Sequence, residues 1–572
     1  MRKTLLAISL GLFALNAGAQ TMYDALNFSQ NEYYGTARSI ALGNAMTALG
    51  GDLGSIGINP AGSAVYNFSQ FTITPGLTIS SQTASYSPYA VNGTDVFKNP
   101  QNTKLTRFTM PNIGMTMNMQ TGNRTGLKAV TFGFTMNMTN NFTGKMLGGG
   151  ANDMTSYMSG LACDAFGYDI DFLNGYGYLD RNGNFVEFDS RNTDYPYDNP
   201  DDRGNYAPWN VINAVQAGAL SNYGDSNDPD YFWRYIAASE RFSDTGEVDD
   251  YGNHIYSVSL AGPLDQSYGR RVTGSKTDAI FNVGFNFNDN IFLGANFGIT
   301  SIDYNYDEYF KEAAQDPSDF LIEYSDASTY FKDFRSQYSY TASGTGIYAK
   351  IGVIALPAPG LRVGAAIQTP TMTGITETWR SAADIHYANS SFDGRAVSPY
   401  GEYSYTLISP FRANAGVAYN FLGMVLLSAD YEITDYSTMK FKADDVFWDA
   451  DFSDVNNDIL DCMGVSHSVR AGIEFKPVPE LATRFGYNFI TTPEYVYEGL
   501  SKRTLNDTVN SWSVGLGYSS KGSFFADIAA RMSTYCDENV FPYADYLADY
   551  TSPALLIKRN RYCVTATLGW RF

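Results

Sequence analysis

Five arginines stand in stretches where apolar residues occupy every second position, and their guanidinium groups are suited to hold carboxylates. The five are Arg362, Arg412, Arg470, Arg484 and Arg571. If these stretches are β-strands, the arginines point to the side opposite the apolar face. Arginine binds a carboxylate through two parallel hydrogen bonds. The carboxylate belongs either to a ligand or to acids of the same chain, such as Glu474 and Asp527, and we favour the second interpretation for most of the five.

No catalytic motif accompanies these arginines. The three histidines, at positions 254, 386 and 467, are far apart and lack the spacing of zinc or haem-iron ligands. The chain has no Gly-x-Ser-x-Gly elbow, His-Glu-x-x-His helix or phosphate loop. Residues 180–189 superficially resemble a calcium loop, but the later ligands are wrongly spaced, and Asn182-Gly183 is also a hairpin turn signal. We expect no enzyme activity, catalytic residue, metal or cofactor, although calcium at this loop stays open.

The first 19 residues have the features of a secretory signal peptide. Arg2 and Lys3 precede an apolar run from Leu5 to Leu15, and Ala17-Gly18-Ala19 forms a small-residue cleavage site before Gln20. The apolar run is too short to span a bilayer as a helix. After residue 19 no apolar run reaches the roughly 18 residues of a transmembrane helix. The sequence therefore predicts an exported chain.

Export permits disulfide bonds between the four cysteines, Cys163, Cys462, Cys536 and Cys563. All four fall in expected outer loops or in the outer half of the last expected strand. Cys536 and Cys563 flank one loop and are the best-placed pair, with free thiols as the alternative.

Charge and aromatic content narrow the class of protein. A net charge of −21 argues against nucleic acid as a partner, because phosphate binding needs clustered Lys and Arg. With 43 Tyr and 37 Phe, the chain is either a large extracellular β protein or a membrane β-barrel.

Alternation of apolar and polar residues predicts many half-buried strands. Tyr562, Val564, Ala566, Leu568, Trp570 and Phe572 alternate with polar or small residues, and so do Phe281, Val283, Phe285 and Phe287. About 14 such stretches occur, near 68–83, 104–119, 127–142, 273–288, 290–306, 335–354, 360–378, 403–421, 423–441, 466–477, 481–493, 508–520, 522–535 and 560–572. A soluble sandwich would show the same period, so periodicity alone does not establish a membrane.

Connection lengths favour the membrane barrel. Short and long connections alternate strictly over an even number of strands, as in barrels with short periplasmic turns and long outer loops. The longest connection, 143–272, is rich in Asp, Asn, Gly and Tyr, and it predicts a large extracellular insertion. The C-terminal aromatic Phe572 resembles the assembly signal of outer-membrane proteins. We therefore expect residues 66–572 to form an all-β transmembrane antiparallel barrel in a bacterial outer membrane.

The stretch from Gly35 to Ala64 is built mostly of Gly, Ala, Ser and Asn and cannot form a core of its own. Apolar residues at 41, 45, 48 and 49 predict one short helix, which Gly50 and Gly51 would end. Asn59-Pro60-Ala61 predicts a turn, because a residue before proline avoids helical geometry. This segment makes sense only if the barrel encloses it.

A Gly/Ala segment that ends in Asn59-Pro60-Ala61 and precedes about 14 strands resembles the FadL family of long-chain fatty acid and hydrophobic-compound transporters. Further similarity lies at Gln368-Thr369-Pro370, at Ser409-Pro410-Phe411-Arg412 and in the hairpin from Val469 to Tyr487. The resemblance covers nearly the whole mature chain, except that 143–272 is longer than the usual family loops.

The resemblance implies a monomeric barrel with an N-terminal hatch at 20–65, in which Gly35, Gly50, Gly51, Asn59, Pro60 and Ala61 are gating candidates. Hydrophobic molecules would enter under the outer loops, and hatch movement with a kink in the third strand, 127–142, would release them sideways into outer-membrane lipid. A second hypothesis is a surface-binding or secretion-accessory barrel whose acidic 143–272 insertion recruits a protein partner. An apolar tunnel through the lumen would distinguish the transporter from the accessory protein.

Overall fold

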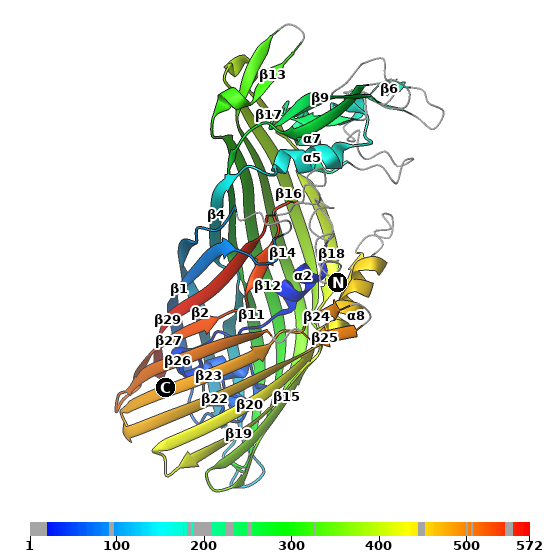
Figure 1. The fold of residues 1–572 in the computed structure, drawn as a ribbon. Helices are drawn as coiled ribbons and strands as arrows, with labels where there is room; N and C mark the ends of the chain where they lie inside the picture. The colour runs from blue at the N-terminus through cyan, green and yellow to red at the C-terminus, as the bar shows by residue number, and fades with distance from the viewer. Residues whose placement is uncertain are drawn as a thin grey trace.

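The computed structural model describes residues 20–572 except 91–95, 176, 180–184, 188–206, 223–233, 249–253, 325–326, 444–451, 499–500, 505–506 and 544–552. The described chain forms one closed antiparallel barrel of 14 strands (Figure 1). Each wall strand pairs with the next along the chain, and β29 returns to pair with β1, with Trp570 opposite Phe71. The expected all-β barrel is confirmed.

The wall strands have alternating burial because one face of each meets the lumen and the other meets the surroundings. They are β1 (Gln70–Tyr86), β2 (Gln101–Gln120), β3 (Leu127–Asn141), β11 (Leu264–Phe287), β12 (Ile291–Ala314), β14 (Ser328–Ala358), β15 (Leu361–Gln368), β19 (Arg412–Phe421), β20 (Val425–Asp435), β22 (Val465–Val478), β23 (Leu481–Thr491), β26 (Thr508–Ser519), β27 (Phe524–Thr534) and β29 (Leu555–Arg571).

Two of the expected strands are broken by proline, which has no N–H to donate to a neighbouring strand. The predicted strand 360–378 divides at Pro370 into β15 and β16 (Met372–Tyr387). The predicted strand 403–421 divides at Pro410 into β18 (Gly401–Ile408) and β19. The predicted strand 423–441 also divides, because Asp435 caps a short 3-10 turn between β20 and β21 (Lys440–Ala443). The outer pieces β16, β18 and β21 pair with one another and carry the wall beyond the barrel proper.

An apolar band on the outer face of three neighbouring strands ends at a common level. On β12 the outward residues are apolar from Ile291 to Ile299, and Ser301 is the first polar one. Ser301 lies opposite Thr277 of β11 and Thr345 of β14, which are also the first polar residues of their outward rows. The band is thus nine residues deep along β12, the length that a tilted strand needs to cross a bilayer.

Helices are short and lie inside the barrel or at its long-loop end. They are α2 (Met22–Ser29), α3 (Ala37–Ala41), α4 (Leu53–Ile56), α5 (Tyr157–Ala165), α6 (Ile170–Leu173), α7 (Trp209–Gln216) and α8 (Ser453–Cys462). Among the described residues, no helix combines the length and the apolar character that crossing a membrane requires.

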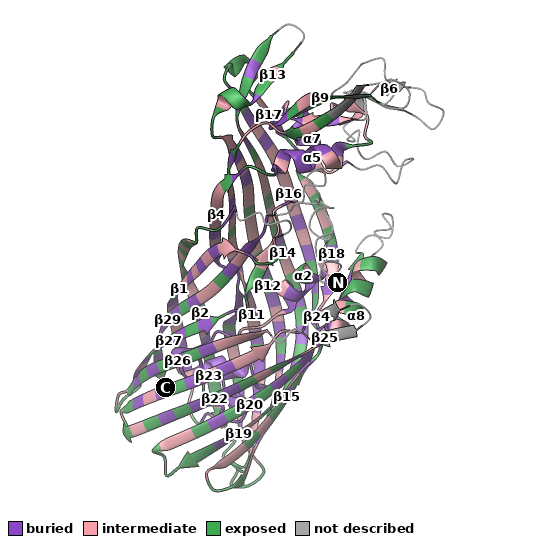
Figure 2. Cartoon of the chain, in the orientation of Figure 1, coloured by how far each residue is buried: buried purple, intermediate pink, exposed green. Residues whose placement is uncertain are grey.

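Residues 20–66, which we call the inner segment, lie within the ring of strands. The segment runs through α2, α3, α4 and the 3-10 helix η1 (Pro60–Val65) before the chain enters β1. Its residues from Gly35 to Ala64 are almost all buried, and Figure 2 shows the lower barrel filled by buried residues. In Figure 1 the inner segment is the blue chain enclosed by strands.

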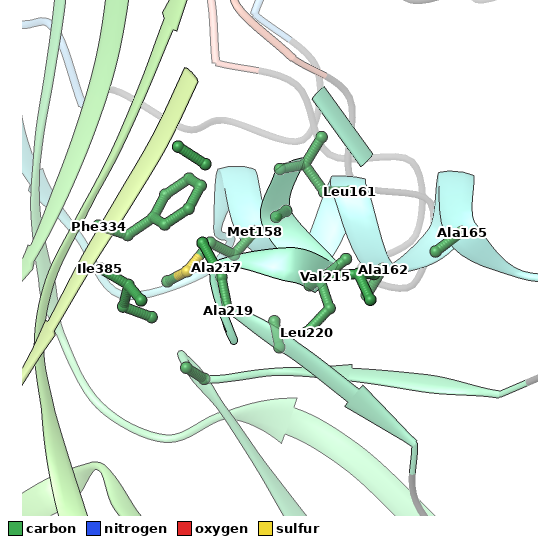
Figure 3. Close-up of a cluster of buried hydrophobic side chains, with 14 of the residues drawn as sticks. Met158, Leu161, Ala162, Ala165, Val215, Ala217, Ala219, Leu220, Phe334 and Ile385 are labelled. Carbon is green, nitrogen blue, oxygen red and sulfur yellow. The ribbon is translucent and has the colours of Figure 1, made fainter. Parts of the chain in front are cut away.

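The 143–272 insertion builds a small core of its own on top of the wall. We call its described part the cap; it contains β4 (Gly144–Asn152), α5, α6, α7, β5 (Gly177–Leu179), β6 (Phe185–Glu187), β7 (Leu220–Asn222), β8 (Tyr235–Ala237), β9 (Glu240–Val248) and β10 (His254–Leu260), and ends in the first residues of β11. Met158, Leu161 and Val215 are buried with Phe334 of β14 and Ile385 of β16 (Figure 3). The cap is therefore fixed to the outward extensions of β14 and β16.

Smaller elements complete the long-loop end. They are β13 (Leu321–Glu323), β17 (Gly394–Val397), β24 (Tyr495–Glu498), β25 (Ser501–Thr504), β28 (Glu538–Val540) and the 3-10 turns η3 (Pro317–Asp319), η4 (Ser390–Phe392) and η5 (Tyr436–Thr438).

Candidate functional site in the barrel lumen

Glycines on eight wall strands let the inner segment lie directly against the barrel backbone. We call them the glycine belt: Gly284, Gly294, Gly352, Gly364, Gly416, Gly472, Gly486 and Gly515. Neighbouring members pair across the wall, as Gly294 does with both Gly284 and Gly352. A methyl group on Gly294 would lie 2.3 Å from the carbonyl carbon of Pro60. A methyl group on Gly486 would lie 2.1 Å from the backbone nitrogen of Gly43. No side chain fits at either position.

The opposite sector of the wall, β29–β1–β2–β3, meets the inner segment through hydroxyl and amide side chains instead. The Ala37 amide donates to Thr567 Oγ1 at 2.7 Å, and Thr567 Oγ1 lies 2.8 Å from Thr74 Oγ1. The Asn118 side-chain amide donates to the Tyr66 carbonyl at 2.8 Å. We expect the inner segment to move more easily along this sector than along the glycine belt. Side-chain hydrogen bonds can change partners, whereas a backbone packed against the glycines cannot shift without atomic overlap.

Of the residues predicted to gate the hatch, Asn59, Pro60 and Ala61 form the seat on the glycine belt, and Gly35 lies apart from it beside Ser39 and Gly54. Asn59 donates from Nδ2 to the Thr47 and Val353 carbonyls, and its Oδ1 accepts from the Ala61 amide. Its extended backbone, with φ −137° and ψ 114°, gives the expected turn before Pro60. Gly50 has φ +59° and lies against Gly62, where a Cβ would be 2.9 Å from the Gly62 Cα. The structure thus brings these residues together apart from Gly35, while their part in gating stays a prediction.

The single helix expected through positions 41–49 is wrong. Helix α3 stops at Ala41, and Gly43 and Asn44 follow with φ of +62° and +61°. The chain unwinds there because its backbone bonds to the wall: the Thr47 amide donates to Asp430 Oδ2 at 2.7 Å. The small residues at helical spacing allow this segment to pack closely against the wall, and they do not form one face of a helix.

The five predicted arginines are all occupied by groups of the chain. Arg484 pairs with Glu474 at 2.6 Å and with Asp527, as the second interpretation expected. Arg412 and Arg470 share Glu432, at 3.4 and 2.9 Å. Arg362 donates to the Leu49 carbonyl, and Arg571 donates to Ser519 Oγ. The five do not form one cluster.

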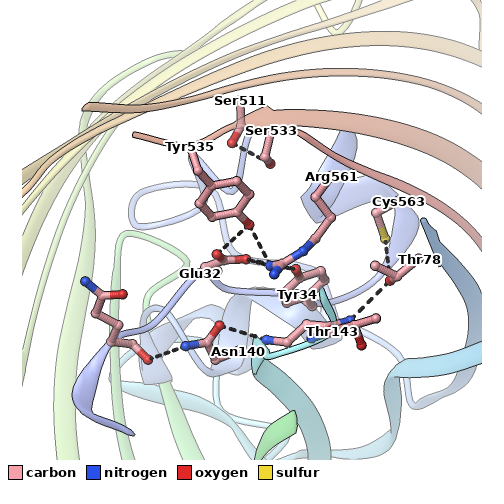
Figure 4. A network of polar contacts seen from close by, with 12 residues as sticks. Glu32, Tyr34, Thr78, Asn140, Thr143, Ser511, Ser533, Tyr535, Arg561 and Cys563 are labelled. Atoms are coloured by element: carbon pink, nitrogen blue, oxygen red, sulfur yellow. Dashed lines mark hydrogen bonds and ion pairs between the residues drawn. The ribbon is translucent and has the colours of Figure 1, made fainter. Parts of the chain in front are cut away.

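A second set of charges ties the inner segment to the wall, and the sequence analysis did not identify it. Glu32 accepts from Arg561 at 2.8 Å and from Tyr34 and Tyr535, in the network of Figure 4. Burial alone would raise the pKa of Glu32, but Arg561 and Arg531 outweigh burial and hold it below the ordinary value. Arg38 reaches Glu474 at 3.1 Å. The sequence did offer a signal for these pairs, because Glu32 and Arg38 are charged residues beside or within a stretch of mostly small residues.

A pocket with about 330 Å³ of empty space, part of it open solvent, separates the inner segment from β19–β23. Its lining residues are Asn31, Glu32, Tyr33, Arg412, Glu432, Thr434, Tyr436, Ser466, Ser468, Asn488 and Ile490. Of the predicted arginines, only Arg412 lines it. The lining is polar apart from Ile490 and the aromatic rings, so the pocket suits the polar end of a ligand.

Apolar contacts gather on the long-loop side of this pocket, around α2. Phe28 packs edge-to-face on Phe142 and Tyr304, with ring centroids 6.3 and 5.5 Å apart. Other members of the cluster come from α2, β12, β14, β16, β18, β21 and α8: Met22, Ala25, Leu26, Ile302, Ala342, Ile375, Tyr405, Leu407, Tyr436, Met439, Phe441, Ile459 and Met463. The chain's own helix therefore fills this apolar part of the lumen.

The wall pairing is interrupted between β2 and β3, at the strand predicted to kink. The β2–β3 ladder ends at Asn112 opposite Asn137, and in the described residues no ladder joins the rest of β2 to β3 or β4. Pro111, next on β2, cannot donate to a ladder. Beyond this point Met138 turns inward and packs with Tyr34. Thr103 Oγ1 donates to the Lys145 carbonyl farther out. We call the stretch between the Asn112–Asn137 pair and the Thr103–Lys145 contact the wall break.

The inner segment covers the β3 edge that β2 leaves. The Glu32 amide donates to the Thr139 carbonyl at 2.7 Å, and the Tyr34 amide donates to the Met138 carbonyl at 2.9 Å. The two acceptors are consecutive residues at a bulge of β3, where Thr139 is left out of the pairing with β11. The wall break is therefore closed from inside by residues 32–34.

Of the two possibilities left open for Cys536 and Cys563, the structure shows free thiols and not a disulfide. Cys563 lies opposite Arg531 on β27 and is buried, with Thr78 Oγ1 donating toward its sulfur. Cys536 is five residues farther along the chain than Arg531, a separation too long for the Cα spacing of a disulfide.

Two of the three histidines each lie beside a polar partner. His386 Nδ1 lies 3.2 Å from Asp333, and His467 Nδ1 lies 2.6 Å from Tyr431 Oη. Within the described residues, no group of three or more His, Cys, Asp or Glu is placed to hold an ion. Of the calcium-like loop, 180–184 and 188–189 lie outside the described residues.

Comparison with known proteins gives matches only among solved structures. No family model matches the chain, and no curated protein matches it. A FadL homologue from Pseudomonas aeruginosa is 11% identical and has a TM-score of 0.45, over 95% of this chain and 98% of that one. The Ralstonia pickettii toluene transporter TbuX is 12% identical with a TM-score of 0.43, over 96% and 100%. The P. putida toluene transporter TodX is 11% identical with a TM-score of 0.45, over 95% and 99%. The first of these belongs to the family that the sequence resembles.

Proposed function

We propose that this chain is a passive outer-membrane transporter of hydrophobic molecules that leave the lumen sideways through the wall break. The wall break carries this proposal because it begins where the apolar band ends: Asn137 lies opposite Asp278, the residue next to Thr277. Phe108 and Met110 of β2 and Leu77 of β1 are exposed apolar side chains beside it. A hydrophobic molecule that passes here enters lipid directly and avoids transfer through water.

Opening the wall break requires a local movement of residues 32–34, which must release Glu32 from Arg561 and Tyr535 as well as from β3. Two backbone hydrogen bonds hold them on β3, and each contributes about 0.5–1.5 kcal/mol net. Residues 41–62 stay seated, because the glycine belt holds them backbone against backbone. Gly35 joins the two parts, and a Cβ there would lie 2.6 Å from Ser39 Oγ. We therefore assign Gly35 as the hinge and Asn59-Pro60-Ala61 as the fixed seat.

Long-chain fatty acids match the order of surfaces in the lumen, where an apolar cluster around α2 is followed by the polar pocket at Arg412. The acyl chain would displace α2 from its apolar cluster, and the carboxylate would bind at Arg412 in the polar pocket. Arg412 and Arg470 share one carboxylate, Glu432, so the pair has positive charge to offer a ligand. In this proposal the ligand enters the barrel at the long-loop end, and the transporter works as a monomer.

A crosslink across the wall break tests this route. Thr103→Cys with Lys145→Cys would join β2 to β4, since Thr103 already contacts the Lys145 carbonyl. The variant is placed in liposomes, and uptake of a fluorescent long-chain fatty acid is measured before and after oxidation. We expect oxidation to block uptake and reduction to restore it.

The matched control is Ser81→Cys with Asn560→Cys, which pairs β1 with β29 on the closed part of the wall. Oxidation of this pair should leave uptake unchanged. Equal uptake in both oxidised variants would contradict sideways exit. Absence of uptake even in the native chain, together with capture of a protein through the cap, would instead favour the secretion-accessory hypothesis.

A further inference from the structure

The start of the inner segment lies against a buried acid of the wall. Gln20 Nε2 donates to Glu377 Oε2 on β16 at 2.9 Å. Glu377 is only 3% exposed. Gln20 would be the first residue after cleavage behind Ala19. The α-amino group of the mature chain would then belong to the same residue whose side chain already contacts this carboxylate.

Glu377 lacks a positively charged partner. Besides Gln20, its donors are the hydroxyls of Tyr340 and Tyr405. Asp24 is close enough to repel it, and it has no basic neighbour among the described residues. Asp24 itself accepts only from the amide and hydroxyl of Thr21. A buried acid and a half-buried acid therefore share a site without an ion pair to a basic side chain among the described residues, an arrangement that is costly unless a charge partner is supplied.

We propose that cleavage of the signal peptide supplies this partner: the α-ammonium group of Gln20 pairs with Glu377, with Asp24 nearby. Before cleavage the same nitrogen is an uncharged amide, so only the mature chain can make the pair. The ion pair fixes α2 against β16 and thereby seats the outer end of the inner segment. This inference rests on the predicted cleavage site and is independent of transport.

The pair also has a chemical consequence for Gln20. An N-terminal glutamine with a neutral amine cyclises: the amine nitrogen bonds to the side-chain carbonyl carbon, and the carboxamide nitrogen leaves as ammonia. A protonated amine has no lone pair for this attack. An amine paired with Glu377 therefore stays uncyclised, and the side-chain amide keeps its own bond to the wall.

Mass spectrometry and amine labelling of the mature protein test the pair. The native protein is treated in detergent at neutral pH with an amine-acylating reagent, and the N-terminal peptide is analysed. We expect a chain that begins at uncyclised Gln20 and reacts slowly while folded. In Glu377→Gln the unpaired amine should react at least about tenfold faster, the effect of one pKa unit, or appear cyclised with loss of ammonia.

The matched control is Glu402→Gln, which removes the same charge from the exposed face of β18 beside Thr378. It should behave as the native protein does. If Glu377→Gln does not assemble, the test uses the native chain alone and compares the acylation rate of its N-terminus in the folded and in the denatured protein. A native chain that begins elsewhere, carries cyclised Gln20, or reacts equally fast folded and denatured would overturn the inference.

Discussion

Replacing Gly294 by alanine puts the seat of the inner segment to a direct test. The added methyl group would lie 2.3 Å from the Pro60 carbonyl carbon and 2.4 Å from the Ala61 nitrogen. Ordinary contacts begin near 3.4 Å, so one backbone must retreat by about 1 Å, and overpacking of this kind costs about 1–3 kcal/mol. The wall cannot retreat, because Gly294 is paired on both sides. The strain therefore falls on the inner segment.

Hydrogen exchange of the inner segment measures this effect. A loss of about 1–3 kcal/mol in local stability accelerates exchange roughly five- to 150-fold where exchange follows local opening. We expect this acceleration at the amides of residues 58–62, while the barrel keeps its heat-modifiable mobility on gels. Gly374→Ala on β16 is the control, since nothing lies within 4 Å of its Cβ position. Unchanged exchange in Gly294→Ala would refute the close seating.

Three further predictions concern the cap, the turn and the thiols. Burial raises the pKa of Asp164 on α5 from 3.8 to about 6, so its ionised form destabilises the cap above pH 6. Asp164→Asn should stabilise α5 by about 1 kcal/mol at pH 8 after solvent screening, and hydrogen exchange of α5 should slow accordingly. This gain should vanish below pH 4, where Asp164 is protonated in both the folded and the unfolded chain. The control, Asp153→Asn at an exposed position, should show no gain at either pH. Asn59→Ala should free the turn from the Thr47 and Val353 carbonyls, raising liposome leakage while the barrel still assembles; failure to assemble would place the segment in the wall. Under a maleimide, Cys536 should label faster in the native protein than buried Cys563, and equal rates would contradict the assigned burial.

The barrel was predictable because its signal is local. Alternation along each strand and the parity of connection lengths can both be read without knowing which strands pair. Proline chemistry is consistent with the breaks at Pro370 and Pro410 but did not identify them, because β1 and β2 continue through Pro75 and Pro111.

The lumen was less predictable because its contacts join distant positions. Gly284 and Gly294 appear in the alternation as small residues, yet only strand register shows that they form a belt. The pair between Glu32 and Arg561 spans 529 positions, and no local pattern encodes it. The state of Cys536 and Cys563 stayed open in the sequence for a related reason: register along β27 and β29 decides their spacing, and distance along the chain does not show it.

The reach of the inner segment has a consequence for how the protein assembles. The first residues to be exported need Arg561 on β29, the last strand to be made. The inner segment therefore has no complete binding surface until the β1–β29 seam has formed. We therefore expect the inner segment to seat only after the barrel has closed, and an unfinished barrel to leave residues 32–34 exposed.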